Sequence, residues 1–191
     1  GEYQEQILRN AYEHKSKIDG VELERRNEYR IAAMAHMMAE GKATDVQYVD
    51  SEGIWDTSRT FQHDKILDGF MEKAERVPHN GECLISGGLG GAGKSTVLRN
   101  YLGIDDKNDY VTINADDIKE EMAERGMIPT ARGLTPMECS ELVHEEASYL
   151  SKQVLNHVSS TRANIILDIT MSSYGSVKKR CDVLQRAGYK K

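Results

Sequence analysis

Residues 88–95 read Gly-Leu-Gly-Gly-Ala-Gly-Lys-Ser and fit the pattern Gly-x-x-x-x-Gly-Lys-Ser in full. A short apolar run, residues 83–86, precedes this segment, and a stretch with a helical pattern, residues 94–101, follows it. Glycines let backbone N–H groups curl round an anion in conformations that a Cβ would block. The N-terminus of the following helix also favours negative charge. A strand, a phosphate-binding loop and a helix in this order predict an α/β fold.

Each polar residue of this loop has an expected role toward ATP. Lys94 is expected to bridge the β- and γ-phosphates, Ser95 to give its hydroxyl to Mg²⁺, and Thr96 to hydrogen-bond an α-phosphate. The predicted cofactor-binding residues are Gly88, Gly90, Gly91, Ala92, Gly93, Lys94, Ser95 and Thr96, with Ser95 as the metal ligand. The alternative, a tight turn with a surface lysine, is disfavoured because the whole pattern occurs between a strand and a helix.

The pattern of apolar residues changes at about residue 78, where Pro78, Asn80 and Gly81 interrupt it. Residues 1–78 are predicted to form an N-terminal all-helical extension, with a break or kink at Gly20 that divides the first stretch into two helices. In residues 79–191, short apolar runs alternate with helical patterns, which predicts a P-loop kinase-like parallel sheet flanked by helices. The expected helices are 2–41, 59–76, 116–125, 137–158 and 175–186, and the expected strands are 83–86, 110–113 and 164–168.

Composition disfavours several other functions. The formal net charge is −6, whereas surfaces that coat nucleic acid are usually basic. No apolar run approaches the roughly 20 residues that span a membrane. Cys83, Cys139 and Cys181 stand far apart without a Cys-x-x-Cys pair, which disfavours zinc binding and predicts reduced thiols in a cytoplasmic protein.

Acidic residues follow two of the predicted strands. Asp116 and Asp117 come after the strand at 110–113, and Asp168 ends the strand at 164–168, two residues before Thr170. Ligands of a parallel sheet bind outside the carboxyl ends of its strands, so either Asp116 or Asp117 is expected to face the phosphate loop, with Asp168 and Thr170 at the same cleft. A kinase needs a carboxylate to orient the acceptor hydroxyl and accept its proton. The alternative for all three acids is capping of a helix or strand end.

The run from Leu84 to Tyr189 resembles the zeta toxin family of P-loop kinases. Four segments carry the resemblance: Gly-Gly-Leu-Gly-Gly-Ala-Gly-Lys-Ser-Thr (87–96), Ile-Asn-Ala-Asp-Asp-Ile-Lys (113–119), Asn-Ile-Ile-Leu-Asp-Ile-Thr (164–170) and Leu-Gln-Arg-Ala-Gly-Tyr (184–189). Trp55, Arg59 and His63 also stand at a spacing similar to that of actinobacterial and phage zeta-like proteins. The resemblance implies ATP-dependent phosphorylation of a sugar hydroxyl on UDP-N-acetylglucosamine.

The resemblance also implies roles for individual residues. Asp116 corresponds to the general base, with Lys94 as the phosphate-binding partner and Lys119 as its basic neighbour. Polynucleotide 5′-kinases share an Asn-x-Asp-Asp segment in which the first Asp is the base. Glu146, beside the apolar stripe of the helix at 137–158, is a further candidate for the cleft. The expected substrate-binding residues are Lys119, Glu146, Asp168 and Thr170.

The acceptor half of the pattern departs from the family. Asp168-Ile169-Thr170 stands where the family has Glu-Gly-Thr, Ser172 replaces an arginine, and Lys152 stands at the position of the sugar-binding Glu. Family members continue past the Ala-Gly-Tyr turn into a lid with transition-state arginines, so the kinase domain is expected to be incomplete at its C-terminus.

Two other functions fit the same residues: a polynucleotide or nucleoside kinase, and a non-catalytic ATP-binding module that switches a partner. The expected ligands are ATP, Mg²⁺ and a small-molecule acceptor, with no membrane and no nucleic acid. Some zeta toxins are held inactive by antitoxin helices, supplied in trans or by the same chain. The resemblance therefore implies an antitoxin partner or a cis-inhibitory role for residues 1–78, which would cap the nucleotide cleft.

Overall fold

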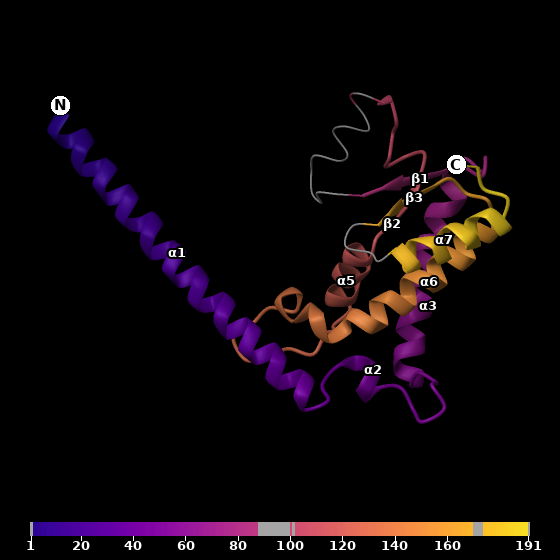
Figure 1. Cartoon of the computed structure of the whole chain (residues 1–191), viewed down its shortest axis with the longest axis horizontal. Coiled ribbons are helices and arrows are strands. Elements are labelled where there is room, and N and C mark those ends of the chain that lie inside the picture. Colours follow the sequence, from indigo (N-terminus) through magenta and orange to yellow (C-terminus); the bar gives the residue numbers. More distant parts are fainter. Residues whose placement is uncertain (1, 88–99, 101, 170–173, 191) are drawn as a thin grey trace.

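Three short parallel strands form the centre of the fold (Figure 1). The structure is a computed structural model that describes residues 2–87, 100, 102–169 and 174–190. Within these ranges, only the backbone is described for residues 11–19 and 174. Strands β1 (Cys83–Ser86), β2 (Val111–Ile113) and β3 (Ile165–Asp168) stand in the order β1-β3-β2, and both pairings are parallel. The central strand is apolar and buried from Ile165 to Leu167, as expected of a parallel strand covered on both faces. The predicted α/β fold with a parallel sheet is confirmed.

Helices surround this sheet in chain order. Before it come α1 (Glu2–Ala39), α2 (Thr44–Gln47) and α3 (Thr57–Arg76). After β2 come α5 (Ala115–Glu124), the 3₁₀ helix η1 (Met137–Val143) and α6 (His144–Ser160), and α7 (Tyr174–Arg186) follows β3. The predicted phosphate loop, Gly88 to Thr96, and the predicted substrate ligand Thr170 lie outside the described residues.

Helix α6 joins two hydrophobic clusters. Its predicted apolar stripe is confirmed, because Ala147, Leu150, Val154 and Val158 are each at most 1% exposed. One cluster contains sheet residues together with Ala74 and Val77 from α3 and the turn after it; the other contains Met34, Ile118, Met122, Leu142 and Leu150. Helix α3 therefore contributes directly to the core beneath the sheet.

Two predicted elements differ from the structure. The break at Gly20 is wrong, because α1 runs unbroken from Glu2 to Ala39. A glycine costs a helix about 1 kcal/mol relative to alanine, and the Glu, Leu, Arg and Lys residues on either side favour helix strongly enough to outweigh that cost. The predicted helix at 137–158 begins instead as η1 and becomes α-helical at His144.

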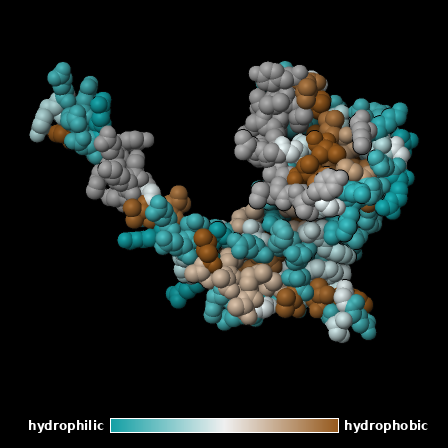
Figure 2. Space-filling model, viewed as in Figure 1, coloured by the Kyte–Doolittle hydropathy of each residue, from teal (hydrophilic) through white to brown (hydrophobic). Residues whose placement is uncertain are grey.

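Helix α1 is held to the body at its C-terminal half (Figure 1). Arg26 Nε donates to Glu138 at 2.8 Å, Arg30 Nη1 donates to Glu141 at 2.8 Å, and the Tyr29 hydroxyl donates to the Arg132 carbonyl at 2.6 Å. The other half projects away from the body, and Figure 2 shows its described start, residues 2–10, as mainly hydrophilic with scattered hydrophobic side chains. Among the described helices, none is long and apolar enough to cross a membrane.

Candidate active site

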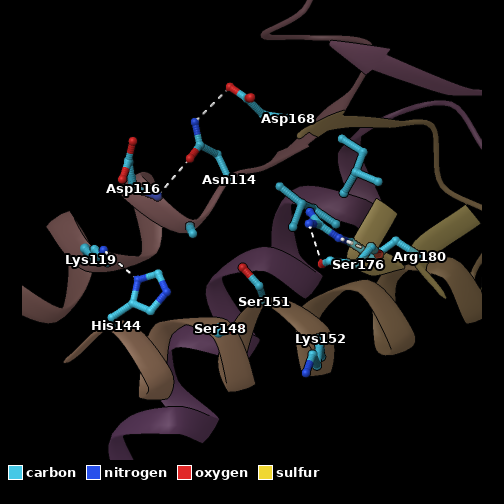
Figure 3. A pocket seen from close by; sticks show the side chains of 13 residues that line it. Asn114, Asp116, Lys119, His144, Ser148, Ser151, Lys152, Asp168, Ser176 and Arg180 are labelled. Atoms are coloured by element: carbon cyan, nitrogen blue, oxygen red, sulfur yellow. Dashed lines mark hydrogen bonds between the residues drawn. The ribbon is translucent and has the colours of Figure 1, made fainter. Parts of the chain in front are cut away.

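A cavity of about 430 Å³ opens at the carboxyl ends of β2 and β3 (Figure 3). Side chains from α5, α6 and α7 complete its wall. The described lining residues are Ile113, Asn114, Ala115, Asp116, Lys119, His144, Ser148, Ser151, Lys152, Leu167, Asp168, Ser176 and Arg180. The cavity therefore lies where a parallel sheet is expected to bind its ligand.

Asn114 forms hydrogen bonds to both aspartates that line this cavity. It follows β2 in an extended conformation and caps α5, because its side-chain oxygen accepts a hydrogen bond from the Asp116 N–H at 2.8 Å. Its side-chain nitrogen donates to Asp168 Oδ2 at 3.1 Å. One amide thus links the start of α5 to the end of β3, as the dashed lines in Figure 3 show.

The two neighbouring aspartates occupy different surroundings. Asp116 lines the cavity, and Asp117 is not among the described lining residues. Partial burial, together with the nearby carboxylates of Glu120, Asp116 and Asp168, raises the pKa of Asp117. Asp116 is therefore the one of the two that faces the cavity, while Asp117 adds negative charge near it.

Basic side chains line the remainder of the cavity. Lys119 Nζ lies 3.4 Å from His144 Nδ1 at one end, and Arg180 Nη2 donates to Ser176 Oγ at 2.9 Å at the other. Partial burial lowers the pKa of the Arg180 guanidinium. Lys152 extends the basic wall along α6. The cavity therefore presents carboxylates on one side and several positively charged side chains on the other.

Glu146 lies elsewhere, in a buried ionic network. Its side chain is fully buried and accepts hydrogen bonds from Arg59 Nε at 3.0 Å and from His63 Nε2 at 2.6 Å, with a further bond from Arg59 Nη2. Burial opposes the ionisation of Glu146, but the bonds from His63 and Arg59 outweigh it and lower its pKa. Glu146 is not among the described residues that line the cavity, so its contacts join α6 to α3.

Aromatic rings surround this network. The rings of Trp55, His63 and Tyr149 lie 5.2–5.6 Å apart. Arg59 packs over the Tyr48 ring at 4.5 Å and donates to the Met127 carbonyl at 2.8 Å. Of the residues singled out by their spacing in the sequence, Arg59 and His63 bind one carboxylate and Trp55 packs on His63, but the sequence alone did not identify Glu146 as their partner.

The end of β1 lies close to the chain that follows β3. Gly87, the residue before the predicted loop, lies so close to β3 that a Cβ there would stand 3.3 Å from Ile169 Cγ1. Ser95, the predicted metal ligand, lies outside the described residues, and the described part contains no group of three or more His, Cys, Asp or Glu residues that could hold a metal ion. Asp168 is the described carboxylate at the strand end that could assist Ser95 in holding Mg²⁺.

Sequence reasoning missed part of the cavity wall. The residues His144, Ser148, Ser151, Ser176 and Arg180 come from helices α6 and α7 and lie outside the quoted motif segments. Their positions depend on how α6 and α7 pack on the sheet, which no local pattern reveals. Asn114 could have been found, because an Asn immediately before an acidic first turn is a common helix cap.

A parallel sheet with acidic and basic side chains at its carboxyl edge, and a complete phosphate-loop sequence after β1, defines the class of P-loop nucleotide-binding proteins. The family model described as Zeta toxin matches residues 63–191, and the chain belongs to this family of P-loop kinases. Membership implies a kinase that binds ATP. The match begins inside α3, before the boundary predicted at residue 78. Comparisons with curated proteins and with solved structures found no match.

Proposed function

We propose that the chain transfers the γ-phosphate of ATP to a hydroxyl group of an anionic small molecule, with Asp116 as the general base. The observation that carries the proposal is that Asp116 shares one cavity with Lys119, Lys152 and Arg180 at the carboxyl ends of β2 and β3. The carboxyl end of β1, which the Gly88–Ser95 sequence follows in the chain, lies at this same edge of the sheet.

The proposed reaction uses each group of the site in one step. Asp116 accepts the proton of the acceptor hydroxyl as that oxygen attacks the γ-phosphorus, and the bond to the β,γ-bridging oxygen breaks to release ADP. Lys94 would hold the β- and γ-phosphates, and Ser95 with Asp168 would hold Mg²⁺, which would offset the phosphate charge. Asn114 keeps the start of α5 and Asp168 in register during transfer.

The basic wall supports an acceptor that carries phosphate. Family membership makes UDP-N-acetylglucosamine the first acceptor to test, since its sugar provides hydroxyls and its diphosphate provides negative charge. Lys152, which stands where the resemblance expects a sugar-binding Glu, contributes a positive charge to the wall instead. Thr170 remains a proposed acceptor ligand. Glu146 is buried, so in this proposal it links two helices and does not bind the acceptor.

Regulation by a helical partner is a further part of the proposal. The family suggests an antitoxin, or an equivalent segment of the same chain. Support comes from the exposed apolar side chains on the projecting half of α1, among them Tyr3, Ile7 and Leu8. Transfer by the whole chain compared with a chain that lacks residues 2–19 tests the version in which the chain inhibits itself.

The deciding experiment compares Asp116→Asn with the wild type, with radiolabelled ATP and UDP-N-acetylglucosamine. Loss of a general base is expected to lower kcat by about 100-fold or more while ATP binding is kept. Asp117→Asn is the matched control, because its carboxylate is adjacent in sequence and is not among the described cavity residues. Equal transfer by Asp116→Asn and the wild type would refute the base assignment.

A further inference from the structure

The ring of His79 contacts two backbone carbonyl groups at once. Its Nε2 lies 2.8 Å from the Ala74 carbonyl oxygen, and its Nδ1 lies 2.8 Å from the Thr161 carbonyl oxygen. A carbonyl oxygen can only accept a hydrogen bond, and a neutral imidazole has one N–H and one bare nitrogen. Both contacts are therefore hydrogen bonds only when both ring nitrogens carry a proton, which makes the ring a cation.

The Ala74 carbonyl needs a donor because of the residue that follows it by four positions. In a continuing helix this oxygen would accept a hydrogen bond from the N–H of residue 78, but that residue is Pro78, which has no N–H. Ala74 lies in the last turn of α3 and is 1% exposed, so water cannot readily replace the missing donor. The His79 ring supplies it.

The second carbonyl belongs to the end of another helix. Thr161 is the C-cap residue of α6, so the ring lies between the C-terminal ends of α3 and α6. The C-terminal end of a helix carries a partial negative charge, which stabilises a cation placed beside it. Two helix ends therefore favour the protonated ring.

The charged residues around these two helix ends do not account for the contact. Those adjacent in sequence to the two carbonyls are Lys73, Glu75 and Arg76 on α3, His157 on α6, and Arg162 after it. Among the described residues, no carboxylate forms an ion pair with His79; Glu72 lies 4.0 Å from Arg76 instead. The Arg162 guanidinium donates to the Gly188 carbonyl at 3.4 Å. The two carbonyls, and not an acid, are thus the partners of the ring.

We propose that His79 is a pH-sensitive clasp between α3 and α6. The doubly protonated ring joins the two helix ends, and loss of one proton leaves one of the carbonyls without its donor. The clasp lies at the amino ends of the strands, where the Pro78 carbonyl accepts the Asn164 N–H at 2.9 Å and the Gly81 N–H donates to the Arg162 carbonyl at 3.0 Å. Its release would loosen the chain that leads from α3 into β1. This inference does not depend on the proposed phosphoryl transfer.

Nitrogen-15 NMR of the histidine rings tests the protonation state directly. The full chain is labelled at histidine, and the His79 signals are assigned by their absence from His79→Gln. At about pH 7, where a free histidine is mostly neutral, we expect both His79 nitrogens to carry a proton. His157 is the control in the same spectrum, because its Nδ1 alone contacts a described carbonyl, that of Gln153 at 2.7 Å. A neutral His79 ring at this pH overturns the proposal.

Urea unfolding tests the consequence for stability. A histidine that holds its proton more tightly in the fold stabilises the fold fully below its unfolded-state value of about 6.5, and this contribution is lost as the pH rises. The ratio of the unfolding equilibrium constant of His79→Gln to that of the wild type should therefore fall by about threefold or more between about pH 6 and about pH 8. His79 is exposed, so the substitution leaves both hydrophobic clusters intact.

Two features make the stability experiment specific to His79. The wild type and His79→Gln both keep His63 and His144, so the titration of these residues cancels from the comparison. His157→Gln is the matched control, and its ratio to the wild type should change by less than about twofold over the same range. A ratio for His79→Gln that does not change with pH overturns the clasp.

Discussion

Asn114 donates a hydrogen bond from its side-chain amide to Asp168 Oδ2 at 3.1 Å, and so ties the start of α5 to the end of the central strand. The carbonyl oxygen of the same side chain accepts the Asp116 N–H at 2.8 Å. The position of the proposed base therefore depends on a neutral residue that has no chemical role of its own.

Two substitutions of Asn114 distinguish the effects of its two hydrogen bonds. Asn114→Ala removes the helix cap and is expected to lower the free energy of unfolding by about 1 kcal/mol. Asn114→Ser keeps a capping oxygen and loses the donor to Asp168, so it should lower kcat with little change in stability. Urea unfolding and phosphoryl transfer, measured on both variants, check this. Wild-type transfer by the serine variant would show that the Asp168 contact does not matter for catalysis.

The buried contact of Arg59 with Glu146 is expected to contribute strongly to stability. Arg59→Met leaves the Glu146 carboxylate without its main cation in a fully buried position. Removal of one partner of such a pair costs about 3–5 kcal/mol, which is a large part of the stability of a domain. Urea unfolding followed by circular dichroism measures this loss.

Arg30→Met provides the control for that experiment. Arg30 pairs with Glu141, whose side chain is 56% exposed, and exposed pairs contribute about 0–1 kcal/mol. The two variants make the same chemical change at a buried and at an exposed ion pair. Similar losses for both would contradict the stabilising role assigned to the buried network.

Stability should depend on pH through Glu146. The fold lowers the pKa of this carboxyl, so its contribution is present above the ordinary value of 4.5 and is lost as the pH falls through the folded-state value. The free energy of unfolding of Glu146→Gln should therefore lie below that of the wild type at pH 7, and the difference should shrink below about pH 4.5. A difference that stays constant over this range would exclude the linkage.

Strands and helix faces were predicted well from the sequence, because each depends on a local pattern of apolar residues. Strand β1 was predicted with its observed bounds, and the apolar stripe of α6 with its observed faces. The continuity of α1 through Gly20 was not predicted, because a single glycine in a helical pattern is a weak breaker whose effect depends on its neighbours. Arg180 and Ser148 could not be placed at the cavity from sequence, since their approach depends on the packing of whole helices.

The basic wall should govern the affinity for the acceptor. Lys152 lines the cavity, so Lys152→Ala is expected to raise KM for UDP-N-acetylglucosamine by roughly tenfold and to leave KM for ATP unchanged, in line with about 1.4 kcal/mol for one charged contact. Lys178→Ala removes an exposed lysine from α7 and should change neither constant. An unchanged acceptor KM in the Lys152 variant would exclude this contact.

A short truncation of α1 should leave the fold intact. The described side chains from residue 2 to residue 10 are exposed, so deletion of residues 2–19 should change the free energy of unfolding by less than about 0.5 kcal/mol. Deletion of the whole stretch up to residue 78 would also remove Ile66, Ala74 and Val77 from the core. A clear loss of stability in the short truncation would show that the projecting half of α1 packs against the body in solution.

The hydrogen bonds between Arg59 and Glu146 also limit where the protein can be truncated. Glu146 lies within the stretch that matches the family, whereas Arg59 lies four residues before that stretch begins. A recombinant fragment cut at the family's own limits would keep the buried acid and discard its guanidinium. The cooperative folding unit is therefore larger than the stretch that matches the family. A recombinant fragment should begin at Asp56, which caps α3, or earlier.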